Sequence, residues 1–242
     1  MLAEEARESI IVALDCDKDR AFELAEQLEG RARWLKVGMT LYYAEGPDIV
    51  RAFKQRGYHV FLDLKFHDIP FQVRGAARSA ALAGADLMSV HALGGSEMLT
   101  ACRAGAEDAA LELGCRPRLL AITVLTSMDA AALNEIGVAD APAPEVERLA
   151  RLAKASGIDG VVCSPQEAAS MRALLGPDAP VVTPGVRPAG AAKGDQSRVA
   201  TPASAIGAGA SHLVIGRPIT GAPDPLAAYE AIVQELVGTE AR

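Results

Sequence analysis

Short apolar runs alternate along the chain with longer segments in which apolar residues recur at helical spacing. The short runs are rich in β-branched residues and cover 10–14, 34–37, 60–64, 87–90, 119–125, 160–163, 181–183 and 213–215. The longer segments are rich in Ala, Leu, Glu and Arg and cover 19–28, 47–56, 73–83, 97–113, 145–155, 165–174, 202–207 and 225–236. The first pattern favours buried strands and the second favours amphipathic helices. The chain is therefore predicted to contain eight successive strand and helix units.

These units follow one another without a composition break or a Ser/Gly-rich linker. A (β/α)8 barrel of the TIM type has this order of elements in about 250 residues. We therefore expect residues 1–242 to form a single-domain TIM barrel with its core at about 10–236. A doubly wound open sheet is the competing α/β fold. The first predicted turn, Leu14-Asp-Cys-Asp-Lys18, lacks the glycine-rich sequence of dinucleotide-binding sheets, which favours the barrel.

Composition and charge exclude several classes of protein. Half of the residues are apolar, and 24 basic against 31 acidic residues give a formal net charge of −7. The basic residues are scattered, so we expect no binding to nucleic acid polymers. No apolar run reaches membrane-spanning length, and the acidic N-terminus does not resemble a signal peptide. We expect a soluble protein of the cytoplasm that does not bind membranes.

Cysteine and histidine spacing gives no indication of a metal site. The four cysteines lie far apart and include no Cys-x-x-Cys pair, and no two of the four histidines stand at metal-ligand spacing. This spacing argues against a zinc site and a disulfide framework, and it favours a reducing compartment.

Ionisable residues lie where several predicted strands end, which is where TIM barrels place their catalytic groups. These residues are Asp15, Lys36, Asp63, Lys65, His91 and Arg217. Asp63 and Lys65 are two positions apart, so a regular strand points both toward the same face. The same spacing lets Asp15 and Lys36 face the barrel axis as well, where the four charges would stabilise one another's ionised forms.

A purely structural salt-bridge cluster is the alternative interpretation of these charges. Buried ion pairs stabilise a fold only weakly, because desolvation offsets most of the Coulomb attraction. The position of the charges at the catalytic rim therefore favours a chemical role.

The segment Asp63-x-Lys65-x-x-Asp68-Ile69-Pro70 resembles the signature of the orotidine 5′-phosphate decarboxylase family. Six further blocks resemble the other motifs of that family in the same order, namely Val12-Ala-Leu-Asp15, Leu35-Lys-Val-Gly38, Val124-Leu-Thr-Ser127, Thr183-Pro-Gly-Val-Arg-Pro188, Gly194-Asp-Gln196 and Val214-Ile-Gly-Arg-Pro218. The resemblance implies conversion of orotidine 5′-monophosphate to uridine 5′-monophosphate and carbon dioxide in pyrimidine synthesis. It implies neither a metal nor an organic cofactor.

The resemblance also implies roles for the charged residues. Lys65 would stabilise the carbanion left at C6 of the pyrimidine and then deliver a proton to it. Asp63 would lie against the substrate carboxylate and hold Lys65 in place. Lys36 would complete the network and bind sugar hydroxyls, and Asp15 would accept a hydrogen bond from the ribose. Asp68 would reach the active site of a partner subunit together with Ile69, which implies a homodimer with shared sites.

The phosphate and the ring would be bound by residues from later loops. Gly216 and Arg217 follow the last predicted strand, where TIM barrels bind phosphate through backbone N–H groups and positive charge. Segment 185–197 is predicted to be a long loop of the kind that often forms a lid. In the family this loop closes on the phosphate, so Gln196 would bond both phosphate and ring, with Arg187 near the base of the loop.

Thr126 and Ser127 are expected at the end of the fifth predicted strand. Their hydroxyls and backbone amides suit the edge of a pyrimidine, and the alternative is an ordinary helix N-cap. With the family resemblance, Thr126 is favoured as a ligand.

One pair of residues departs from the family pattern. After Ile69-Pro70 the family usually has Asn-Thr, whereas this chain has Phe71-Gln72. Gln72 can still donate and accept hydrogen bonds. We therefore expect an altered ribose contact and affinity and an unchanged reaction.

Two other functions stay open. A magnesium-dependent sugar-phosphate decarboxylase or aldolase of the same barrel group shares the Asp-x-Lys-x-x-Asp spacing, but Asp68-Ile69-Pro70 argues against it. The other is a catalytically silent nucleotide-binding barrel, which retention of all five charged positions disfavours.

Overall fold

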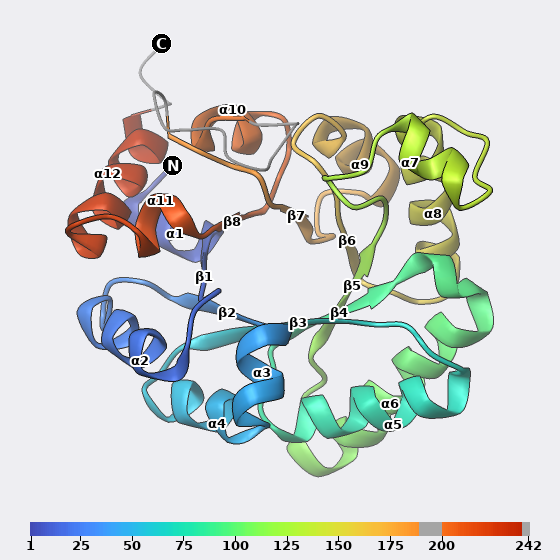
Figure 1. Ribbon diagram of the computed structural model, residues 1–242, viewed down its shortest axis with the longest axis horizontal. Coiled ribbons are helices and arrows are strands. Elements are labelled where there is room, and N and C mark those ends of the chain that lie inside the picture. The colour runs from blue at the N-terminus through green and yellow to red at the C-terminus, as the bar shows by residue number, and fades with distance from the viewer. Residues whose placement is uncertain (189–199, 239–242) are drawn as a thin grey trace.

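Parallel strands close into a barrel in the computed structural model, which describes residues 1–188 and 200–238. In this part of the chain the strands are β1 (Ile10–Ala13), β2 (Trp34–Gly38), β3 (His59–Phe66), β4 (Leu87–His91), β5 (Arg118–Ile122), β6 (Gly160–Val162), β7 (Val181–Thr183) and β8 (His212–Ile215). Each strand pairs with the next along the chain, and β8 pairs with β1 (Figure 1). The predicted TIM barrel is thus confirmed, and an open sheet is excluded because the β8–β1 pairing leaves no edge.

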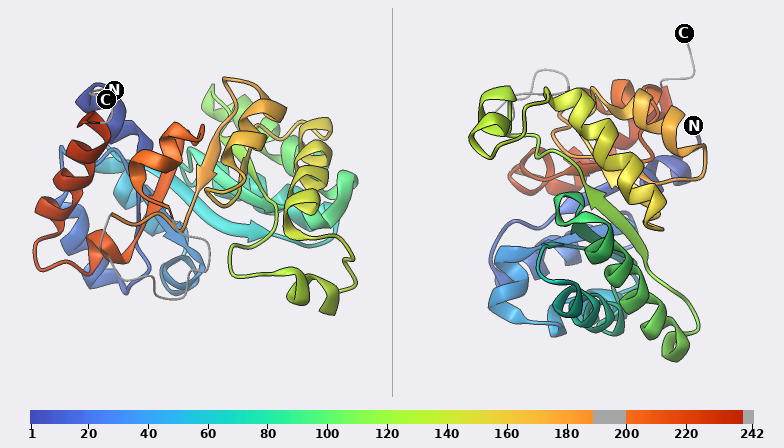
Figure 2. Two further views of the ribbon diagram at one scale, coloured as in Figure 1. Left: turned by 90° about the horizontal axis from the view of Figure 1, so that it is seen from above. Right: turned by 90° about the vertical axis from the view of Figure 1, so that its right-hand side faces the viewer.

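Helices surround the barrel on its outside (Figure 1). Those that the sequence predicts are α2 (Lys18–Gln27), α4 (Asp48–Gln55), α5 (Pro70–Leu82), α6 (Gly95–Leu113), α8 (Pro142–Ala155), α9 (Ala168–Leu175), α10 (Pro202–Gly207) and α12 (Pro225–Val237). Short helices that it does not predict are α1 (Ala3–Ser9), α3 (Met39–Glu45), α7 (Ala130–Glu135), α11 (Arg217–Thr220) and the 3₁₀ turn η1 (Ala92–Gly94). They contain at most about two turns, which leaves only a weak helical repeat in the sequence. The helix α10 is equally short, but Thr201 and Pro202 mark its start. The helix α7 stands away from the ring (Figure 2).

The length and apolar character of a helix decide whether it could cross a membrane. No helix in the described ranges, 1–188 and 200–238, combines the length and apolar character needed to cross a bilayer.

Apolar side chains fill both faces of the sheet. A small cluster inside the barrel contains Ile11, Phe61, Leu87, Leu120 and Val182, whereas the large cluster lies between strands and helices. Because side chains alternate along a strand, the residues two positions later also point inside, nearer the carboxyl ends. On β3, β4 and β5 these residues are Asp63, Ser89 and Ile122. The polar side chains of Asp63 and Ser89 thus lie next to the apolar interior layer, on its carboxyl-end side.

The strand β3 does not keep a regular pairing with β4. Leu62 pairs with Met88 and Phe66 with Val90, so Asp63, Leu64 and Lys65 lie opposite Ser89 alone. Lys65 has φ 53°, and no other non-glycine residue in the described ranges has a positive φ. The strand β3 thus extends beyond the predicted end at residue 64, and a bulge around Lys65 interrupts the regular alternation that the sequence predicts for Asp63 and Lys65.

The strand β5 is shorter than predicted. It ends at Ile122, which is also the last residue of β5 that pairs with β4 and with β6. Beyond this point no ladder supports an extended strand, and a turn closed by the Met128 N–H and the Leu125 carbonyl follows. Thr126 therefore lies in this turn and not at the strand end.

Candidate active site

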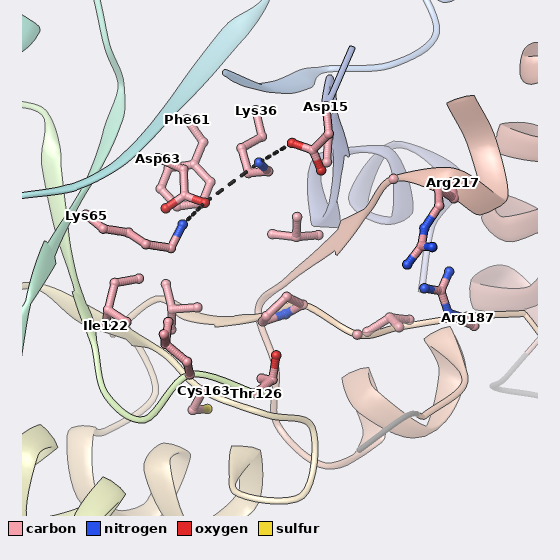
Figure 3. Close-up of a pocket in the computed structure, with 18 of the residues that line it drawn as sticks. Asp15, Lys36, Phe61, Asp63, Lys65, Ile122, Thr126, Cys163, Arg187 and Arg217 are labelled. Carbon is pink, nitrogen blue, oxygen red and sulfur yellow. Dashed lines mark hydrogen bonds and ion pairs between the residues drawn. The ribbon is translucent and has the colours of Figure 1, made fainter. Parts of the chain in front are cut away.

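A cavity of about 480 Å³ opens at the carboxyl ends of the strands (Figure 3). Its middle is lined by apolar residues from several strands, including Ala13, Phe61, Ile122, Val162 and Val214. Charged side chains lie at two ends of this apolar section. A volume of a few hundred Å³ with few convergent polar groups is typical of small-ligand sites.

Acidic and basic side chains alternate at one end of the cavity. The Nζ atom of Lys65 lies 2.8 Å from Asp63 Oδ2, and Lys36 Nζ lies 2.9 Å from Asp15 Oδ1. Lys36 Nζ is also 3.8 Å from Asp63 Oδ2, which joins the two pairs into one row (Figure 3). The structure therefore brings the four charged residues predicted at the strand ends together before any ligand is bound.

Asp63 is the buried centre of this row, with only 11% of its side chain exposed. Burial by itself would raise its pKa, but Lys65, Lys36 and hydrogen bonds from Lys65 and Ser89 outweigh burial and lower the pKa. The carboxylate is consequently ionised at neutral pH and is held by two cations.

Gly38 leaves room for the ion pair between Lys36 and Asp15. A Cβ atom at this position would lie 3.1 Å from Lys36 Nζ and 3.3 Å from Asp15 Oδ1. Such contacts are tighter than ordinary van der Waals packing. Glycine at the end of β2 thus lets the ammonium and the carboxylate meet.

Two guanidinium groups occupy the other end of the cavity. Arg187 follows β7 and Arg217 begins α11, and their side chains point toward one another (Figure 3). Burial and the positive charge of Arg217 lower the pKa of Arg187. Gly216 and Thr220 also line the cavity. This concentration of positive charge is suited to an anionic ligand.

Thr126 and Cys163 line the wall between these two ends (Figure 3). Thr126 reaches the cavity from the turn after β5. Cys163 also lines the cavity, and the spacing of the four cysteines gives no indication of this. Gln196 and the other positions of the predicted lid from 189 to 197 lie outside the described residues.

Three predicted site residues do not line the cavity of their own chain. Asp68 is exposed, and its Oδ1 accepts a hydrogen bond from the Ile69 N–H at 2.6 Å. Ile69 is 62% exposed, the neighbouring Phe71 is 81% exposed, and Gln72 is exposed at the start of α5. These residues form an exposed, partly apolar surface next to the end of β3.

His91 ends β4 close to the charged row without lining the cavity. Its ring stacks on that of His67, with centroids 5.3 Å apart and planes 30° apart. Burial, His67 and Lys65 lower the pKa of His91 to about 4. The imidazole is therefore neutral at physiological pH. In the described ranges no group of three or more His, Cys, Asp or Glu side chains is arranged to hold a metal ion.

Comparison with known proteins identifies the family of this chain. The model of the orotidine 5′-phosphate decarboxylase / HUMPS family matches residues 8–232. The chain belongs to this family. The description of this family contains two names, so individual relatives are compared next.

Two bacterial relatives in the family cover nearly the whole chain. A protein of Anaeromyxobacter sp. (strain K) named orotidine 5′-phosphate decarboxylase is 54% identical over 230 residues, which are 95% of this chain and 98% of that protein. A protein of the same name from Alkalilimnicola ehrlichii is 52% identical over 232 residues, covering 96% and 97%. The crystal structure of orotidine 5′-phosphate decarboxylase from Lactobacillus acidophilus has a TM-score of 0.84 and 41% identity, covering 95% of this chain and 99% of that chain.

Proposed function

We propose that this chain converts orotidine 5′-monophosphate to uridine 5′-monophosphate and carbon dioxide. The observation that carries the proposal is the ammonium group of Lys65, held 2.8 Å from the buried carboxylate of Asp63 on the wall of the cavity. Membership of the family and the names of relatives that are 52–54% identical support the same activity. The arrangement of charges suits this reaction for a specific electronic reason.

Decarboxylation breaks the bond between C6 of the pyrimidine and its carboxylate carbon. Carbon dioxide leaves, and the electron pair stays on C6 in the plane of the ring, where the π-system cannot delocalise it. A fixed positive charge beside C6 stabilises this carbanion more than it stabilises the bound substrate, which is the condition for catalysis. Lys65 supplies that charge, then transfers a proton from Nζ to C6 and regains one from water. No metal or organic cofactor takes part in the proposed step.

Asp63 acts mainly by positioning Lys65 in this proposal. Its carboxylate would also lie near that of the substrate, where like-charge contact raises the energy of the ground state. The two cations around Asp63 offset much of this repulsion, so we favour the positioning role. Lys36 and Asp15 would bind the ribose hydroxyls at the far end of the row.

The two guanidinium groups would bind the phosphate. A phosphate dianion between Arg187 and Arg217 would accept charge-assisted hydrogen bonds and relieve the repulsion that lowers the pKa of Arg187. Backbone N–H groups around Gly216 and the side chain of Gln196 would donate further hydrogen bonds to the phosphate. Thr126 would form a hydrogen bond with the edge of the ring. Closure of the 185–197 loop would exclude water from the reacting atoms.

We also propose a homodimer in which Asp68 and Ile69 enter the site of the partner subunit. The exposed side chains of Ile69 and Phe71, next to the end of β3, are the kind of apolar surface that a partner covers. Gln72 would replace the usual threonine in the ribose contact of the family. The cytoplasm remains the proposed location of the enzyme.

A magnesium-dependent sugar-phosphate enzyme is the rival function, and one assay separates the two. Purified protein is mixed with orotidine 5′-monophosphate in excess chelator, and the loss of pyrimidine absorbance is followed. We expect full turnover in chelator. A strict requirement for magnesium would contradict the proposal, and nucleotide binding without turnover would indicate the catalytically silent barrel.

A further inference from the structure

Ser89 lies beside the charged row but outside the cavity. It is on β4, two residues after Leu87 of the interior cluster, so it points into the barrel at the level of Asp63. Its relative exposure is 0%, and it is not among the described residues that line the cavity. A ligand in the cavity would therefore meet Lys65 and Asp63 and not Ser89.

The hydroxyl of Ser89 joins the two residues that carry the proposed chemistry. It donates to Asp63 Oδ1 at 2.8 Å and accepts from the backbone N–H of Lys65 at 2.9 Å. A serine hydroxyl has one proton, and the backbone N–H of Lys65 cannot accept it. The direction of both hydrogen bonds is therefore fixed.

The bulge in β3 explains why this hydroxyl is needed. Three residues of β3 lie opposite Ser89 alone, and Lys65 has the positive φ that this irregularity requires. The displaced N–H of Lys65 finds its acceptor in a side chain, as buried backbone donors require. A positive φ is unfavourable for a residue with a long side chain, so it persists only where its surroundings fix it.

We propose that Ser89 is a positioning residue for the decarboxylation, holding the Lys65 ammonium in place through the bulge and through Asp63. The hydroxyl fixes Lys65 at its backbone, while Oδ2 of Asp63 fixes the same residue at Nζ. Without the hydroxyl, one buried donor and one carboxylate oxygen lose a partner together. The proposal rests on the proposed function, because positioning matters only if Lys65 acts on a substrate.

The test compares Ser89→Ala with Ser89→Thr, which keeps the hydroxyl, and with Ser9→Ala. Ser9 is a matched control because it is also buried, and its hydroxyl donates to the Ala6 carbonyl before β1 begins. We expect Ser89→Ala to lower kcat roughly ten- to a hundredfold, as losses of supporting hydrogen bonds do. Its affinity for uridine 5′-monophosphate should change by less than about twofold. Ser89→Thr should regain part of kcat, and Ser9→Ala should keep wild-type kinetics.

A pH profile separates positioning from general loss of structure. Burial raises the pKa of Asp63, and Lys65, Lys36 and, to a smaller extent, the hydrogen bond from Ser89 lower it. In Ser89→Ala the acidic limb of kcat should therefore move to higher pH. Wild-type kcat in Ser89→Ala, or equal losses of kcat and nucleotide affinity, would overturn the proposal.

A crystal structure of Ser89→Ala gives a readout that does not depend on activity. We expect Lys65 to lose its positive φ or its contact with Asp63. An unchanged Lys65 would overturn the positioning role even if the wild type is active. Absence of turnover in the wild type would instead contradict the proposed function.

Discussion

Arg187 and Arg217 direct their guanidinium groups toward one another at the end of the cavity away from Lys65 (Figure 3). Burial and the positive charge of Arg217 both lower the pKa of Arg187, because each makes its charged form less favourable. A ligand with two negative charges between the two guanidinium groups would make their close approach favourable. In the proposed function this pair binds the phosphate, while the reaction takes place at the other end of the cavity.

Replacing Arg217 should reduce catalysis only for a phosphorylated substrate. We expect Arg217→Ala to lower kcat/KM for the nucleotide by about 2–3 kcal/mol, roughly 30- to 150-fold, because charge-assisted hydrogen bonds are lost. Turnover of the nucleoside orotidine, which has no phosphate, should change far less. Arg151→Ala is the matched control, since Arg151 pairs with Glu147 on the exposed face of α8. Equal losses with both substrates would remove Arg217 from phosphate binding.

Much of the fold could be predicted from the sequence because each strand and helix unit must bury its own apolar face. Strand and helix periodicities survive in the sequence for the long elements, and their alternation predicts the barrel. Helices as short as α7 and α11 leave no such repeat. The early end of β5 depends on where β4 and β6 stop pairing, which is a property of the folded barrel.

The charged residues of the candidate site could be predicted from the sequence, but the backbone geometry around them could not. Asp63 and Lys65 stand out because ionised residues are unusual in an apolar run. The bulge that orients Lys65 leaves no trace in the sequence, since no glycine marks the positive φ there. Ser89 in β4 and Cys163 just after β6 are missed because a single serine or cysteine carries no chemical signal by itself. Alternation counted from the interior residues of each strand would have placed Ser89 inside the barrel.

Mixing of variants tests whether Asp68 acts in the site of the partner subunit. Lys65→Ala and Asp68→Ala are each expected to be nearly inactive. A dimer with one subunit of each kind would contain one intact site, so random exchange of subunits should restore about a quarter of wild-type activity. Mixing Lys65→Ala with Asp63→Asn is the control, because both changes lie in the site of their own chain and every site would stay impaired. Recovery in the control alone, or in neither mixture, would contradict a shared site.

Partly buried histidines should make the fold less stable in mild acid. Burial, Arg118 and Arg172 lower the pKa of His212 to about 4 from an ordinary value of 6.5. Between these values the unfolded chain binds a proton that the folded chain does not, so stability is fully present above pH 6.5 and falls toward pH 4. The expected slope is at most about 1.4 kcal/mol per pH unit for this residue. Urea unfolding over this range should show a shallower slope for His212→Asn, and an identical slope would contradict the assignment.

The central claim is that the ammonium group of Lys65 stabilises the carbanion and donates the proton. The most direct measurement is kcat of Lys65→Ala together with its affinity for uridine 5′-monophosphate. Lys154→Ala is the control, because Lys154 donates to the Leu174 carbonyl at the surface. We predict that Lys65→Ala abolishes turnover and still binds the nucleotide, while Lys154→Ala behaves as the wild type. Turnover at the wild-type rate in Lys65→Ala would contradict the account.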